Sequence, residues 1–250
     1  MSTGPPKDQF DRDGFVVVPS LLSDGDFAEL VANIDRFIRE VVPHLPDGDA
    51  FYVDRSHPET LKQLHRLERD PFFRESANHP TWSGLARSLL GEDVETMAVE
   101  WFDKPPGTPS PTPPHQDNYY FNLKPPLVVT LWMALDPVDE ENGGLRYIAG
   151  SHRRGLRPHS RSGLLGFSQG IGDYGPEDAA REAPIRLRPN DVVAHHGETI
   201  HRADPNRSEA RHRRAFAMVF RGVSCRRDEE GFARYQASLR AQNRELGLKT

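Results

Sequence analysis

The spacing of apolar residues changes near residue 93, and this change limits the folds open to the chain. Between residues 27 and 38 the apolar positions recur every three or four residues, which predicts a helix over 23–42 with Ser23 as its N-cap. The other helices expected in this part begin at Pro58 and span 71–78 and 80–90. After residue 93 short β-type runs dominate, so we predict an α+β protein with a β-sandwich or barrel core.

The predicted strands are short apolar runs, many of them β-branched, that are bounded by turn residues. They cover 15–19, 94–102, 127–135, 145–148, 184–187, 191–196 and 213–223. A closing helix is expected over 227–247, and 151–181 is a long Gly/Ser/Arg-rich segment of the kind that forms a lid or binding loop. We expect residues 1–9 to be disordered and residues 10–250 to form one domain.

Bulk composition narrows the class of protein. The net charge of −5 and the pI of about 6.1 argue against nucleic acid as the main partner. Cys225 is the only cysteine, so no internal disulfide can form, and a reducing cytoplasm is the expected compartment. No apolar run approaches the roughly 18 residues of a membrane span, so no membrane partner is expected. The composition leaves the oligomeric state open.

The segment His115-Gln116-Asp117 carries the strongest chemical signal. Side chains two residues apart on a strand point to the same face, so this imidazole and this carboxylate can converge on one metal ion. A second histidine would complete a two-histidine, one-carboxylate set. That set suits non-heme Fe(II), because it leaves coordination positions for a cosubstrate and O₂.

The second histidine has to be chosen from the other ten in the chain. Those in the helical part are expected at the surface or in packing: His44, His57, His65 and His79. We choose His201 because Arg213 follows twelve residues later, at the start of an apolar strand that can return beside it. The cosubstrate of such an iron is a 2-oxo acid, whose far carboxylate suits a guanidinium. An arginine solvated at a strand end remains the alternative for Arg213.

Several further motifs stand in a recognisable order along residues 10–223. They are Asp11-x-x-Gly14-Phe15-Val16-Val17, Lys104-Pro105-Pro106-Gly107, Pro114-His115-Gln116-Asp117 with Tyr120-Phe121, Leu131-Trp132-Met133-Ala134-Leu135, Glu141-Asn142-Gly143-Gly144-Leu145 with Gly150-Ser151-His152, Gly197 with Ile200-His201, and Asn206-Arg207-Ser208 before Arg213-Arg214-Ala215. Together they make the chain resemble the phytanoyl-CoA dioxygenase family of Fe(II)/2-oxoglutarate-dependent oxygenases.

This resemblance implies a double-stranded β-helix, or jelly roll, flanked by N-terminal helices and a C-terminal helix. It implies Fe(II), 2-oxoglutarate and O₂ as cofactor and cosubstrates. The implied iron ligands are His115, Asp117 and His201, and the implied cosubstrate-binding residues are Arg213, which would bind the C5 carboxylate, with Lys104 and Trp132 lining the pocket.

Two positions bear on how closely the chemistry follows the family. Many members carry a serine two residues after the distal histidine, where this chain has Ala203, so Thr130 or another hydroxyl is expected to supply the lost hydrogen bond. Asp117 is a carboxylate, whereas halogenating relatives have a small residue there. Hydroxylation of a small organic substrate, with release of succinate and CO₂, is therefore the expected reaction.

The substrate is less well determined. A basic stretch could bind an anionic substrate such as a carboxylate, a phosphonate or a CoA thioester, or it could be a solvated loop: Arg146, Arg153, Arg154, Arg157, His159 and Arg161. The aromatic run 119–121 could line an apolar substrate wall or belong to the core. Two other functions stay open, a metal-binding jelly roll that binds or regulates without oxidising and a hydrolytic zinc enzyme with the same three ligands.

Overall fold

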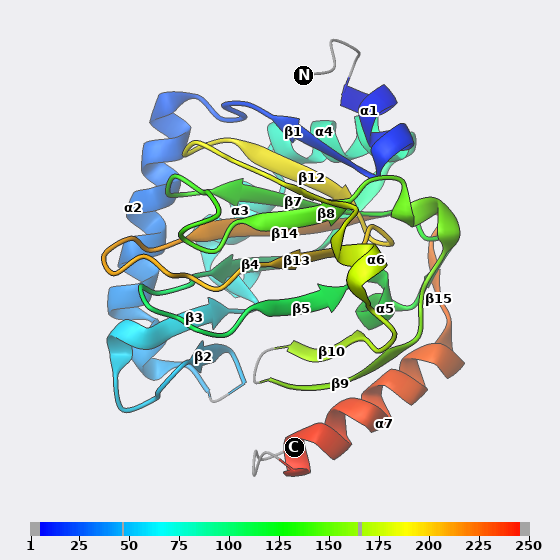
Figure 1. The fold of residues 1–250 in the computed structure, drawn as a ribbon. Coiled ribbons are helices and arrows are strands. Elements are labelled where there is room, and N and C mark those ends of the chain that lie inside the picture. Colours follow the sequence, from blue (N-terminus) through cyan, green and yellow to red (C-terminus); the bar gives the residue numbers. More distant parts are fainter. Residues whose placement is uncertain (1–5, 47, 165–166, 246–250) are drawn as a thin grey trace.

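Two antiparallel sheets face each other and form a jelly roll (Figure 1). The computed structural model describes residues 6–46, 48–164 and 167–245. In the larger sheet the strand order is β1-β12-β7-β14-β4-β3-β2, and in the smaller one it is β11-β8-β13-β5. Neighbouring strands in both sheets are mostly distant in sequence, so the pairing depends on the tertiary fold.

The strand bounds are as follows. The larger sheet contains β1 (Phe15–Val18), β2 (Ala50–Tyr52), β3 (Leu61–Leu64), β4 (Val94–Phe102), β7 (Val128–Ala134), β12 (Val192–His196) and β14 (Ala215–Gly222). The smaller sheet contains β5 (Thr112–His115), β8 (Leu145–Ile148), β11 (Glu182–Pro184) and β13 (His201–Ala203). Two short ribbons pair β9 (His159–Leu164) with β10 (Phe167–Ile171) and β6 (Leu123–Lys124) with β15 (Arg226–Arg227).

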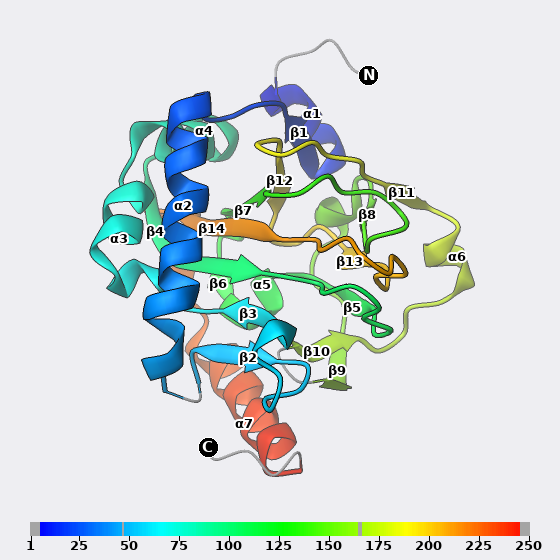
Figure 2. The ribbon, with the colours of Figure 1, turned by 90° about the vertical axis from the view of Figure 1, so that its left-hand side faces the viewer.

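Helices from the first part of the chain cover the outer face of the larger sheet. They are α2 (Asp24–Glu40), α3 (Pro71–Ala77) and α4 (Pro80–Leu90), and α2 crosses in front of the strands in Figure 2. The remaining α-helices are α1 (Pro6–Asp13), α5 (Asn118–Phe121), α6 (Pro176–Ala179) and α7 (Glu229–Glu245). Short 3₁₀ turns lie at Val42–His44, Pro58–Thr60, Leu67–Arg69 and Ser151–Arg154. Among the described residues, no helix has the length and apolar character needed to cross a bilayer.

Alternation along β14 separates two cores. Phe216 and Met218 point to the helices and join the larger core, while Ala215 and Ala217 point between the sheets. The small side chains of Ala215 and Ala217 thus pack in the inner core that also contains Trp132 and Tyr147.

Most of the predicted elements are confirmed. Ser23 caps α2, since its hydroxyl accepts a hydrogen bond from the Asp26 amide at 3.2 Å. The long strands β4, β7, β12 and β14 and the closing helix lie where they were expected, with ends shifted by a residue or two. The expected strand over 184–187 lies earlier, at β11.

Three expectations about local structure are wrong. Pro58 opens a 3₁₀ turn rather than a helix, because the residues after it form β3 and pair with β4. Residues 6–9, expected to be disordered, belong to α1, which buries Phe10 against the larger core; residues 1–5 lie outside the described part of the chain. The expected long loop over 151–181 contains the β9–β10 hairpin and α6.

Candidate metal centre

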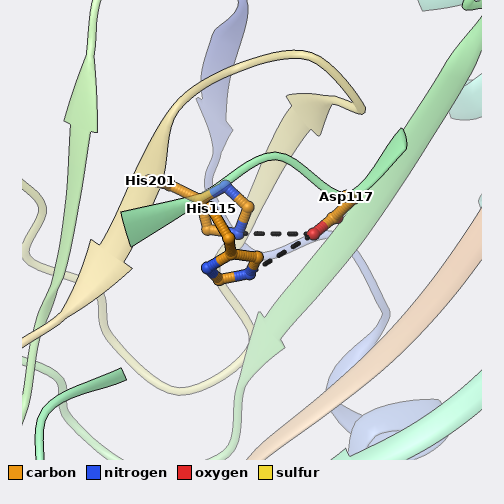
Figure 3. Close-up of side chains that lie close together, drawn as sticks. All are labelled: His115, Asp117 and His201. Atoms are coloured by element: carbon orange, nitrogen blue, oxygen red, sulfur yellow. Dashed lines mark ion pairs between the residues drawn. The ribbon is translucent and has the colours of Figure 1, made fainter. Parts of the chain in front are cut away.

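His115, Asp117 and His201 converge at one end of the smaller sheet (Figure 3). His115 ends β5 and His201 begins β13, and the two residues are direct cross-strand partners. One ligand atom from each of the three side chains lies within 4.8 Å of the others. Asp117 is not on the strand with His115: it precedes α5, so a turn rather than strand alternation brings its carboxylate back.

Backbone carbonyls set the tautomer of both histidines. The Nδ1 atom of His115 lies 2.8 Å from the Pro113 oxygen, and that of His201 lies 3.0 Å from the Thr199 oxygen. A carbonyl can only accept, so each Nδ1 carries the proton, and each Nε2 presents its lone pair. The Nε2 atoms lie 3.5 Å and 3.6 Å from Asp117 Oδ1. This is the form in which imidazole binds a metal.

The protonation states fit the same arrangement. Burial, together with the neighbouring imidazoles of His115 and His195, lowers the pKa of His201 well below its ordinary value. Burial alone would raise the pKa of the Asp117 carboxyl, but the facing histidines outweigh it and hold that pKa well below its usual range. At neutral pH the site therefore presents neutral imidazole and an ionised carboxylate.

The second carboxylate oxygen of Asp117 is occupied by hydrogen bonds. Thr130 donates its hydroxyl to Oδ2 at 2.6 Å, and His195 Nε2 lies 3.0 Å from the same oxygen. Thr130 has a single proton, and this hydrogen bond uses it. The expected hydrogen bond from Thr130 to the cosubstrate stays a prediction. No role at the site was predicted for His195 from the sequence. His195 lies two residues after Val193 on β12, so it shares the inward face of that strand with Val193. This spacing could have placed His195 beside the site.

A second group of side chains lies between the sheets, around Arg213. This side chain is buried, at 5 % exposure, and its guanidinium carbon lies 5.2 Å from the centre of the Trp132 ring. Its Nε atom is buried without a hydrogen-bond partner. Burial lowers the pKa of Arg213 to about 10, so the group stays charged at neutral pH. A buried cation with an unused donor is costly unless an anion compensates it.

Lys104 is the second buried cation near Arg213. Its Nζ donates to the backbone oxygens of Asp204 at 2.7 Å and Ser110 at 3.3 Å. Burial, and then the charge of Arg213, lowers the pKa of Lys104 to about 6. Ala203 is buried in the same inner core and offers no hydroxyl. The structure thus brings Arg213, Lys104 and Trp132 together.

The basic stretch of 146–161 is mostly committed to partners within the protein. Arg146 pairs with Asp204, Arg157 with Asp173 and Asp178, and Arg161 with Glu245, while Arg153 donates to the backbone of α1. Both ring nitrogens of His159 are engaged, and burial lowers its pKa to about 4, so it is uncharged at neutral pH. The structure gives these groups structural roles, which weakens the case for an anion site.

Aromatic side chains flank the metal candidate. The Tyr120 ring lies 5.9 Å from the His115 ring and its hydroxyl donates to the Gln169 oxygen at 2.8 Å. Tyr119 stacks on His159, and Tyr235 of α7 packs on both tyrosines. Tyr119 and Tyr120 thus adjoin the site, whereas Phe121 packs into a small core behind it.

Comparison with known proteins agrees with this geometry. The profile described as Phytanoyl-CoA dioxygenase (PhyH) matches residues 10–215. Peroxisomal phytanoyl-CoA dioxygenase of Rattus norvegicus is 25 % identical over 234 residues, which cover 87 % of this chain and 68 % of that protein. The match therefore spans most of both chains.

Solved structures of complexes with 2-oxoglutarate also superpose on this fold. EvdO2 of Micromonospora carbonacea var. aurantiaca, complexed with 2-oxoglutarate, superposes with a TM-score of 0.68 at 25 % identity, covering 87 % of this chain and 90 % of EvdO2. The epimerase SnoN, in complex with Fe³⁺, alpha ketoglutarate and nogalamycin RO, superposes with a TM-score of 0.69 at 22 % identity over 88 % and 83 % of the two chains. SnoN's likeness bears on the fold alone.

Proposed function

The chain belongs to the phytanoyl-CoA dioxygenase family, an Fe(II)/2-oxoglutarate-dependent oxygenase family that uses O₂, and from this premise we propose that it hydroxylates a small organic molecule. The balanced reaction consumes the substrate R–H, 2-oxoglutarate and O₂ and releases R–OH, succinate and CO₂. Bound iron and 2-oxoglutarate supply the O₂ activation and the hydrogen abstraction, and the protein supplies binding, orientation and shielding.

In this proposal each residue of the site has a distinct task. His115 and His201 offer Nε2 and Asp117 offers Oδ1 to Fe(II), a donor set that fits this metal. Arg213 binds the far carboxylate of 2-oxoglutarate through its guanidinium, and Trp132 supports the guanidinium plane. Lys104 lies on the same side and gains a positive charge when the bound dianion raises its lowered pKa.

The buried Nε of Arg213, which has no partner, is the single observation that carries the proposal. A jelly roll that only bound a metal would have no use for a buried guanidinium with an unpartnered donor between its sheets. A zinc hydrolase would have no use for it either. A dicarboxylate that chelates the metal at one end and reaches Arg213 with the other compensates this charge.

The pairing of the basic loop also bears on the substrate. Because four of its arginines are tied to internal acceptors, we propose that the substrate is small and largely uncharged, in contact with Tyr119 and Tyr120. An anionic substrate held by this loop would have to displace those internal partners.

The test is 2-oxoglutarate binding to Mn(II)-loaded protein by calorimetry, followed by succinate release with Fe(II) and O₂. Hydrogen bonds to charged groups contribute about 1.5–3 kcal/mol, so Arg213→Gln should weaken 2-oxoglutarate binding about ten- to 150-fold. Arg221→Gln is the matched control, because Arg221 lies near the far end of β14, the strand that Arg213 precedes, and pairs with Glu95 at the surface. Asp117→Ala should abolish succinate formation. Equal 2-oxoglutarate affinity in the two arginine variants would contradict the proposal.

A further inference from the structure

We infer that Tyr147 and His195 act as positioning residues that hold Asp117 as a one-oxygen ligand for the metal. The inference rests on the proposed function, since it assumes that His115, Asp117 and His201 bind a metal. It concerns two side chains that are not ligands in that set and that no motif of the sequence singled out. Their effect is on how the ligand set is held, and it can be measured without turnover.

The two side chains form a continuous buried chain to the carboxylate. The Tyr147 hydroxyl lies 3.0 Å from His195 Nδ1, and His195 Nε2 lies 3.0 Å from Asp117 Oδ2. Tyr147 is fully buried and the His195 side chain is 2 % exposed, so bulk water does not compete for these contacts. The rings are fixed by packing: Phe15 stacks on Tyr147 at 4.7 Å, and Tyr147 stacks on His201 at 5.5 Å.

The direction of each hydrogen bond follows from the chemistry of its ends. The Asp117 carboxylate can only accept, so His195 Nε2 carries the hydrogen in that contact. In neutral His195 the Nδ1 atom is then a lone pair, and the Tyr147 hydroxyl donates to it. In this series of hydrogen bonds, the Tyr147 hydroxyl and the His195 Nε2–H each donate to one acceptor. Tyr147 therefore holds the histidine tautomer, and the histidine orients the carboxylate.

The consequence lies in which oxygen of Asp117 stays available. Oδ2 receives two donors, from His195 and Thr130, whereas Oδ1 lies 3.5–3.6 Å from the two Nε2 atoms. A carboxylate that bound through both oxygens would occupy one more coordination position. A metal that also binds a chelating 2-oxo acid and O₂ has no position to spare. Holding Oδ2 away thus keeps that position open.

Cross-strand pairing in the two sheets brings the hydrogen-bonded side chains together. Tyr147 on β8 is the direct partner of His201 on β13, so it lies across from a proposed ligand in the smaller sheet. His195 on β12 is the direct partner of Thr130 on β7, so the two donors to Oδ2 sit side by side in the larger sheet. Side chains of the larger sheet thus bond to Oδ2 of Asp117, while the histidines of the smaller sheet lie near Oδ1.

The test measures Mn(II) affinity of the metal-free protein, with the free ion counted by electron paramagnetic resonance. His195→Leu should raise the Kd about 10- to 100-fold, as loss of a residue that orients a ligand commonly does. His195→Gln should restore most of the affinity, because its amide can donate to Oδ2. His196→Gln is the matched control: the neighbouring ring faces Phe10 and His152, and its loss should leave the Kd unchanged.

Tyr147→Phe provides a second, nearly isosteric variant and a coupling test. Alone it should weaken Mn(II) binding by a smaller factor, and in the His195→Leu background it should have no further effect, because Tyr147 acts through His195. An unchanged Kd in His195→Leu, or an equal Tyr147→Phe effect with and without His195, would overturn the inference. Asp117→Ala separates the two levels: if it binds Mn(II) like the parent, the metal site itself is wrong; if it alone loses binding, only the positioning role is wrong.

Discussion

Arg213 and Lys104 place two cationic groups in an interior that offers them few partners. Arg213 has an unused buried donor, and the pKa of Lys104 falls to about 6 because burial and Arg213 both disfavour its charge. Such groups lower the stability of the free protein unless an anion compensates them. At the residue scale, the unpartnered donor of Arg213 and the lowered pKa of Lys104 are therefore the features that indicate an anion-binding site.

The lowered pKa of Lys104 predicts that 2-oxoglutarate binding takes up a proton. Between pH 6 and 8 the free protein carries mostly neutral Lys104, and a bound dianion raises its pKa and favours the ammonium form. Affinity should therefore increase as pH falls through this range, by up to about tenfold per pH unit, and level off below pH 6. Calorimetry in buffers with different ionisation enthalpies measures the protons taken up.

Lys104→Met is the comparison variant for this measurement. It should bind 2-oxoglutarate more weakly at pH 6.5 and show no linked proton uptake. Zero proton uptake by the parent protein at pH 7.5 would mean that Lys104 does not face the cosubstrate.

At the scale of elements, docking of α1 depends on one glycine. Gly14 follows α1 with φ +81°, and a Cβ there would lie 2.4 Å from His152 Nδ1 and from Thr199 Oγ1. His152 and Arg153 contact the backbone of α1 at Asp11 and Arg12. His152 thus has a structural role, because it joins the turn after β8 to the N-terminal helix.

Gly14→Ala should destabilise the protein through both strain and overpacking. Left-handed backbone costs a non-glycine residue about 1 kcal/mol, and the forced contacts add about 1–3 kcal/mol. Gly91→Ala is the matched control: Gly91 has φ +78° at the end of α4, but a Cβ there meets nothing within 4 Å. Urea unfolding of both variants measures the difference. An equal decrease in the free energy of unfolding in the two variants would show that close packing around Gly14 does not contribute.

At the scale of the whole molecule, the site joins strands that are remote in sequence. Lys104 bonds to the backbone of Asp204, a hundred residues away, and Asp117 bonds to His195 across 78 residues. The metal and 2-oxoglutarate would therefore connect the two sheets. Their binding to the native state alone should stabilise the entire fold.

Mn(II) with 2-oxoglutarate should raise the melting temperature of the protein. A ligand at a hundred times its Kd adds about 2.7 kcal/mol, and a chain of 250 residues gains about 2–4 °C per kcal/mol. The expected shift is therefore about 5–10 °C, and Arg213→Gln should lose the part that 2-oxoglutarate contributes. Calorimetric scans with metal alone, and with metal and 2-oxoglutarate, separate the two contributions. No shift with either ligand would contradict the site.

Local sequence determined much of this protein. Helical and β periodicities placed α2, α3, α4 and the long strands, because apolar spacing reports which face an element buries. The three proposed ligands, His115, Asp117 and His201, were predicted as well, because their side chains are chemically distinctive at readable positions, and the structure brings these three together.

Tertiary structure alone decided the rest. Thr130 and His195 both bond to the same oxygen of Asp117, because sheet pairing sets these two residues side by side. The basic loop became a set of internal ion pairs for the same reason: its partners come from elsewhere in the chain. A sequence shows which groups can donate or accept. Which partner each one finds depends on long-range packing, and here that packing defines the site.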